Sequence, residues 1–139
     1  MPQQPPIRVM IVDDNPRFRE VLRSLLERDD QITVVGEADN GETIVEQAES
    51  CAPDVVLMDL SMPGVNGLEA TLQLKRRRPG IEVVMLSTTD DDDAIGSVLA
   101  GGASAFLHKS TPAADIVELL KKGLPVPPAA PLRVRPSTS

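Results

Sequence analysis

The stretch IRVMIVDD at residues 7–14 decides the fold that we expect. Its first six residues are mostly β-branched or apolar, and two adjacent acids, Asp13 and Asp14, follow them. A short apolar run of this kind is typical of a strand that is buried on both faces of a sheet. Similar runs recur along the chain, at residues 33–35, 54–58, 82–86 and 105–107.

Longer amphipathic segments separate these runs. In the first segment, apolar residues recur at a spacing of three or four, as on one face of a helix, at Phe18, Val21, Leu22, Leu25 and Leu26. Favourable N-cap residues, two of them followed by proline, indicate helix starts at 15–16, 40–43 and 111–112. Gly123 is placed to end the last helix.

Alternating strands and helices pair their strands in parallel through right-handed crossovers, so that helices cover both faces of the sheet. We therefore predict one α/β domain with a doubly wound, five-stranded parallel sheet, flavodoxin-like, with strand order 2-1-3-4-5. The domain is expected at residues 6–123, after a flexible N-terminus at 1–5. Residues 124–139 are rich in proline, alanine and serine and are expected to form a linker or tail.

The composition limits the classes of function. A chain of 139 residues with 41% hydrophobic content fits one domain. Its net charge of −7 argues against nucleic-acid or anionic-membrane binding by this segment. The single cysteine, Cys51, excludes an internal disulfide, and no apolar stretch is long enough to span a bilayer. A soluble, cytoplasmic protein is expected.

Polar residues are expected to meet at one edge of the sheet. In open α/β sheets, ligands bind at the carboxyl ends of the strands, near the point where strand order reverses. The first predicted strand ends in Asp13 and Asp14, the third in Asp59, the fourth in Ser87, and the fifth is followed closely by Lys109. Three carboxylates, a hydroxyl and an ammonium group should therefore converge there.

This set of groups points to metal-assisted phosphoryl transfer. Clustered carboxylates repel one another unless a cation lies among them, and hard oxygen ligands favour Mg²⁺, with Mn²⁺ as the alternative. The cation and Lys109 can neutralise an incoming phosphoryl group, while Ser87 can donate a hydrogen bond to it. Asp59 is best placed as the nucleophile, since it lies on the central strand and precedes the turn at 62–64.

Each of these residues taken alone also has an ordinary structural interpretation. An aspartate at a strand end commonly caps a turn, and a lone Lys109 or Ser87 fits a solvated loop, so only the joint arrangement favours a site. His108, the one histidine, could be a ligand but more simply points away from the direction of Lys109. The acidic run at 90–93 fits a first helical turn, and the basic run at 75–78 fits a last one.

The motifs resemble the receiver domain of bacterial two-component response regulators, over residues 7–122. They are the acidic pair in VDD at 12–14, DLSMPGVNG at 59–67, Ser87, and GASAFLHK at 102–109. The resemblance implies a signalling switch with self-phosphorylation and self-dephosphorylation chemistry only, rather than an enzyme. It also implies that Asp14 and Asp59 bind Mg²⁺ directly with the backbone carbonyl of Ser61, while Asp13 helps through water.

A phosphorylation relay is implied by the same resemblance. Asp59 would accept the phosphoryl group from a sensor histidine kinase. Ser87 would then move toward the phosphoryl oxygen, Phe106 would swing inward behind it, and Lys109 would bridge to the phosphate. The altered surface would change the contact with an output domain or form a homodimer.

Two positions depart from the pattern of the family. Ser110 stands where many receivers place a proline directly after the lysine, and His108 stands where an apolar residue is expected. The sequence is most similar to receivers that precede a LuxR-type helix-turn-helix domain. We therefore expect a receiver taken from a longer transcription regulator, with the tail as its linker; a stand-alone receiver with a tail is the alternative.

Two rival functions remain open at this point. A phosphatase of the haloacid dehalogenase type also forms an aspartyl-phosphate with Mg²⁺, but it normally has two aspartates two residues apart after the first strand, together with a capping insert. A receiver-like interaction module would keep the fold without ever receiving phosphate. Such modules commonly lose the acidic pair, the acceptor or the lysine, and this chain keeps them all.

Overall fold

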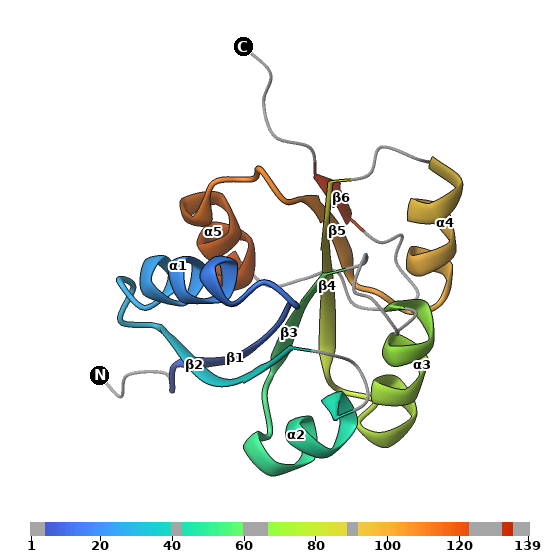
Figure 1. Cartoon of the computed structure of the whole chain (residues 1–139), viewed down its shortest axis with the longest axis horizontal. Coiled ribbons are helices and arrows are strands. Elements are labelled where there is room, and N and C mark those ends of the chain that lie inside the picture. The colour runs from blue at the N-terminus through green and yellow to red at the C-terminus, as the bar shows by residue number, and fades with distance from the viewer. Residues whose placement is uncertain (1–4, 40–42, 60–66, 89–91, 123–131, 135–139) are drawn as a thin grey trace.

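The computed structural model describes residues 5–39, 43–59, 67–88, 92–122 and 132–134. Strands and helices alternate along this part of the chain, as the sequence predicts (Figure 1). The strands are β1 (Ile7–Val12), β2 (Ile32–Ala38), β3 (Val55–Asp59), β4 (Glu82–Ser87), β5 (Ala105–His108) and β6 (Leu132–Val134). The helices are α1 (Pro16–Leu26), α2 (Ile44–Cys51), α3 (Gly67–Arg77), α4 (Asp92–Ala100) and α5 (Ala113–Lys122).

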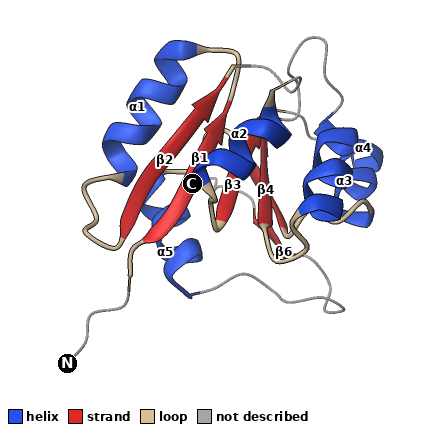
Figure 2. Cartoon of the chain, turned by 90° about the horizontal axis from the view of Figure 1, so that it is seen from below, coloured by secondary structure: helices blue, strands red, loops and turns tan. Residues whose placement is uncertain are grey.

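The sheet is parallel throughout, with the order β2-β1-β3-β4-β5-β6. The predicted order 2-1-3-4-5 is confirmed, because the strands of the expected domain follow it. Figure 2 shows the sheet with helices on either side of it. Strand order reverses at β1, which has β2 on one side and β3 on the other. The carboxyl ends of β1 and β3 therefore lie side by side at the place where open sheets bind ligands.

A sixth strand adds to the five that were predicted. Leu132–Val134 lies in the segment predicted to be a linker, and it pairs in parallel with the outer edge of β5, with Leu132 opposite Ala105. An open edge strand presents unpaired N–H and C=O groups, so a neighbouring extended segment can add to it. The proline-rich composition of the tail hides this short apolar-polar-apolar triplet.

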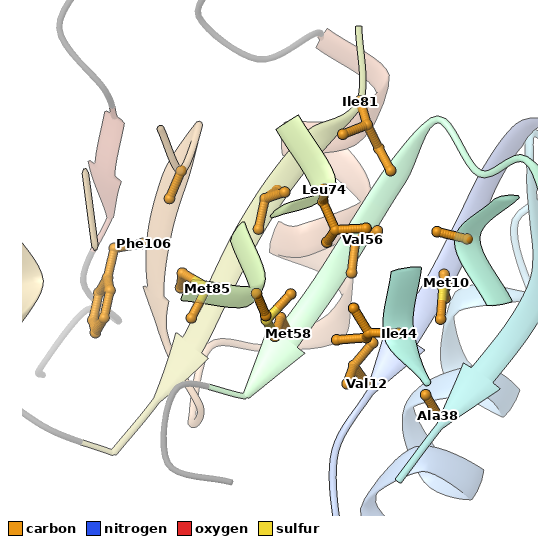
Figure 3. Close-up of a cluster of buried hydrophobic side chains, with 14 of the residues drawn as sticks. Met10, Val12, Ala38, Ile44, Val56, Met58, Leu74, Ile81, Met85 and Phe106 are labelled. Atoms are coloured by element: carbon orange, nitrogen blue, oxygen red, sulfur yellow. The ribbon is translucent and has the colours of Figure 1, made fainter. Parts of the chain in front are cut away.

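Two hydrophobic cores lie on the two faces of the sheet, because successive strand residues point to opposite faces. On one face, alternate residues such as Met10, Met58 and Met85 pack under α2, α3 and α4 (Figure 3). On the other face, Ile11 and Leu57 pack under α1 and α5. Burial on both sides explains why the strands read as continuous apolar runs.

The first helix starts as the sequence predicts. The Oδ1 atom of Asn15 accepts hydrogen bonds from the backbone N–H groups of Arg17 at 3.0 Å and Phe18 at 3.2 Å, and Pro16 occupies the first turn. Of the start predicted at 40–43, only Thr43 lies in the described part, directly before α2. Gly123 falls outside the described residues.

Helix α2 ends in a strained residue, which gives a test of the packing. Its C-cap, Ala52, has a φ of 49°, and its N–H donates to the carbonyl of Ala48 at 2.9 Å. A left-handed conformation costs an L-residue free energy that glycine avoids. We expect Ala52→Gly to raise the free energy of unfolding by about 0.5–1 kcal/mol, measured by urea denaturation.

The matched control for this substitution is Ala70→Gly, inside α3. Ala70 is buried and helical, so glycine there should lower the free energy of unfolding by about 1 kcal/mol or more. A loss of stability for Ala52→Gly as well would contradict the left-handed C-cap.

Candidate functional site

Three carboxylates meet where β1 and β3 end. Asp13 follows β1 directly and Asp59 is the last residue of β3, and these two strands are neighbours in the sheet. Together with Asp14, each of them presents one carboxylate oxygen, and these three oxygens lie within 4.8 Å of one another. Asp13 and Asp59 are only 1% and 5% exposed, while Asp14 is exposed. The sequence prediction that these three acids converge is confirmed.

Lys109 completes the cluster from the far side of β4. Its Nζ atom lies 2.8 Å from Oδ2 of Asp13 and 3.4 Å from Oδ2 of Asp59. It also lies 4.5 Å from the centroid of the Phe18 ring, a cation–π arrangement. Burial lowers the pKa of this ammonium, but its contacts with Asp13 and Asp59 outweigh burial, so that the pKa of Lys109 lies above its ordinary value of 10.5.

Asp13 is held from two sides. Its Oδ1 atom accepts a hydrogen bond from the N–H of Asn15 at 2.8 Å, in the turn that leads into α1. Its backbone carbonyl accepts a hydrogen bond from the guanidinium of Arg19. Its buried Oδ2 atom has no hydrogen bond of regular geometry within the described part of the chain, although the Lys109 ammonium lies close to it. This oxygen is available to a cation or to a water bound by one.

Behind Asp13 lies an ion-pair network that sequence reasoning missed. Arg19 donates to Oε1 of Glu37 at 3.2 Å, and Glu37 accepts from Arg23 at 2.7 Å through Oε2. The hydrogen bonds to Glu37 and Glu27 raise the pKa of Arg23. These side chains come from α1 and the end of β2, which the sequence places far apart, so no local spacing signals their meeting.

The donor set suits a hard divalent cation. Carboxylate oxygens are the ligands that Mg²⁺ and Mn²⁺ prefer, and one buried oxygen of Asp13 lacks a regular hydrogen bond. Asp13, Asp14 and Asp59 could together hold such an ion. The backbone carbonyl of Ser61, the remaining predicted ligand, lies outside the described residues.

Ser87 and Phe106 lie beside this cluster. Ser87 is the buried last residue of β4, and its carbonyl accepts the backbone N–H of Lys109 at 2.8 Å. Phe106 is 3% exposed and lies opposite Met85 in the core (Figure 3). The ring is thus buried in this structure, and its expected movement on phosphorylation stays a prediction.

His108 does not join the acidic cluster among the residues that the structure describes. Its ring bonds instead to Ser110, two residues further along. Of the acidic run at 90–93, residues 92 and 93 begin α4, in agreement with the expected first helical turn. Lys75, Arg76 and Arg77 form the last turn of α3, as expected.

The family model described as the response regulator receiver domain matches residues 9–121. This chain belongs to that family. The match covers every strand of the predicted domain except the first residues of β1. None of the helices in the described ranges has the length and apolar content that crossing a membrane requires.

The curated relatives of this receiver are named transcriptional or response regulators. The transcriptional regulatory protein DegU of Brevibacillus brevis is 41% identical over 115 residues, which are 83% of this chain and 49% of that protein. The nitrate/nitrite response regulator NarL of Escherichia coli is 37% identical over 120 residues, 86% of this chain and 56% of that protein. The receiver thus spans about half the length of these relatives.

Solved receivers share its fold. The receiver domain of the response regulator described as NarL from Mycobacterium tuberculosis has a TM-score of 0.80 at 31% identity, covering 86% of this chain and 96% of that one. A LuxR-family response regulator from Aurantimonas has a TM-score of 0.79 at 30% identity, covering 84% of each chain. The expected similarity to receivers of LuxR-type regulators is confirmed.

The ion pairs of Lys109 give a test of the site without any ligand. We expect Lys109→Ala to lower the free energy of unfolding by about 1–3 kcal/mol at pH 7, because three carboxylates then face one another without a cation. The loss should shrink when millimolar Mg²⁺ is added, since the ion binds only the folded state. Urea denaturation with and without the ion measures both effects.

The contribution of the Lys109 ion pairs to the free energy of unfolding depends on pH, in a direction set by the shift of the Lys109 pKa. The pKa of Lys109 is raised in the folded protein. The stabilisation is therefore fully present at a pH below the pKa of the unfolded chain, and it is lost as the pH rises through the higher pKa of the folded protein.

Lys122→Ala is the control for Lys109→Ala, because Lys122 makes an exposed 3.9 Å pair with Glu118. Equal effects of the two substitutions at pH 7 would contradict the role given to Lys109.

Proposed function

We propose that this receiver is a phosphorylation-dependent switch of a two-component system, in which Asp59 accepts a phosphoryl group. The observation that carries the proposal is one buried carboxylate, Asp59, set between two further acids and the ammonium of Lys109, 3.4 Å away. A carboxylate in such a place can act as the nucleophile and can also be one of the ligands of a cation.

The proposed transfer uses a sensor histidine kinase as donor. An oxygen of the Asp59 carboxylate forms a bond to phosphorus, the phosphorus–nitrogen bond of the donor phosphohistidine breaks, and its electron pair stays on the imidazole nitrogen. Mg²⁺ held by Asp14, Asp59 and the carbonyl of Ser61, with Asp13 acting through water, would neutralise the charge of the phosphoryl oxygens. Lys109 supplies a second positive charge at the same place.

The relay that follows is also part of the proposal. Ser87 ends β4 one residue beyond Leu86, which lies opposite Asp59, so its hydroxyl is in a suitable strand position to bond a phosphoryl oxygen. Phe106 lies on the adjacent strand, behind this position. Contacts of Ser87 and Lys109 with the phosphate would favour one of two states and so alter the surface formed by α4, β5 and α5.

The output is proposed from the relatives. DegU and NarL are named regulators about twice as long as the matched region, so we propose that this receiver controls an output domain on a longer chain, in the cytoplasm, with a homodimer formed on phosphorylation. The net charge of −7 supports leaving nucleic-acid binding to that output domain rather than to this segment.

Intact mass after incubation with acetyl phosphate and Mg²⁺ tests the proposal. We expect a gain of about 80 Da in the unmutated chain and none in Asp59→Ala, because the substitution removes the acceptor oxygen. Chelation of the ion should abolish the gain. Asp30→Ala is the matched control, since Asp30 is an exposed loop carboxylate, and it should be labelled normally.

Labelling of Asp59→Ala at the normal rate would place the chemistry on another residue. An unmutated chain that shows no magnesium-dependent adduct, even when quenched early, would favour a receiver-like interaction module that is never phosphorylated.

A further inference from the structure

The loop between β5 and α5 is a tight turn centred on Lys109. The N–H of Thr111 donates to the carbonyl of His108 at 2.9 Å, so Lys109 and Ser110 are the two central residues of a β-turn. The backbone N–H of Lys109 donates to the carbonyl of Ser87 at 2.8 Å, which ties the start of the turn to β4. The direction of the Lys109 side chain therefore depends on the geometry of this turn.

A side-chain bond closes the turn from outside. The Nδ1 atom of His108 lies 3.2 Å from the backbone nitrogen of Ser110 and 2.7 Å from its Oγ atom. A backbone N–H can only donate, so Nδ1 accepts, and the neutral ring carries its proton on Nε2. The same pattern, from a side chain to the N–H two residues on, holds Asp13 to Asn15 at 2.8 Å.

The two residues depend on each other. A proline at position 110 has no N–H and could not make the bond to His108. The two departures from the family pattern noted in the sequence are thus one feature: His108 brings an acceptor, and Ser110 brings the N–H and the hydroxyl that meet it. His108 and Ser110 flank Lys109 in the sequence.

We propose that His108 and Ser110 are positioning residues that aim the Lys109 ammonium at Asp13 and Asp59. Neither touches the reacting atoms, and the catalytic part of the inference rests on the function proposed for Lys109. Lys109 has a long, flexible stem, so a turn that fixes its Cα and Cβ atoms reduces the number of conformations in which Nζ misses the carboxylates. The ring of Phe18, on α1, contacts the same ammonium and restricts its movement on that side.

Two substitutions at one position separate this role from simple packing. His108→Leu keeps the bulk but removes the acceptor, whereas His108→Asn keeps one, because Asn Oδ1 and His Nδ1 are the same number of bonds from Cα. With acetyl phosphate and saturating Mg²⁺, we expect His108→Leu to slow labelling about three- to tenfold and His108→Asn to stay near the unmutated rate. Ser110→Ala, which keeps the N–H, should have a smaller effect than His108→Leu.

Magnesium affinity provides the internal control. The proposed ligands of the ion are the aspartates and a backbone carbonyl, so His108→Leu should leave this affinity within about twofold. Calorimetry is the suitable method, since the chain has no tryptophan or tyrosine. A matching fall in magnesium affinity, or equal slowing by His108→Leu and His108→Asn, would overturn the inference.

A double-mutant cycle tests the positioning even if the chain is never phosphorylated. His108→Leu should lower the urea midpoint more in the unmutated background than in Lys109→Ala, because part of its effect acts through the ion pairs of Lys109. Equal shifts in the two backgrounds would overturn the inference, and they would do so whatever the outcome for Asp59. Absence of labelling in the unmutated chain would instead reject the proposed function alone.

Discussion

Balance of charge at one end of the sheet is the constraint on which the site depends. Burying Asp13 and Asp59 beside each other is costly unless positive charge compensates, and Lys109 supplies it at 2.8 and 3.4 Å. Three ionised carboxylates and one ammonium leave a formal charge of −2. A divalent cation bound by the three carboxylates would cancel this remainder, which supports the proposed metal site.

The parallel sheet is what allows this charge to be gathered. Strands β1 and β3 are pinned by cores on both faces, so the positions of their last residues are fixed to within small movements. The N-terminus of α1 begins directly beyond Asp13, and Asn15 both caps the helix and bonds the Asp13 carboxylate. Helix N-termini favour negative charge, so the same local geometry that starts α1 also stabilises the acidic pair.

The sequence predicted those features that repeat or that lie at strand ends. Apolar runs predicted the strands. The acids that follow these runs predicted the cluster of Asp13, Asp14 and Asp59, because the carboxyl ends of parallel strands lie at one edge of the sheet. The network of Arg19 and Glu37 could not be foreseen, since it joins segments related only by packing. Strand β6 was missed because three residues in a proline-rich tail are too few to show a strand's alternation of apolar and polar residues. Its pairing also depends on the unpaired edge of β5 rather than on its own sequence.

The burial of Phe106 bears on how a signal would leave the site in the proposed switch. A ligand shifts an equilibrium only by its differential affinity for two states. The ring is 3% exposed in this structure, so a switch that only buried it further would gain little apolar burial. New contacts of the phosphate with Ser87 and Lys109 would then supply most of the proposed difference between the two states. The turn at Lys109 leads into α5, and it would carry that difference from the site to a surface helix.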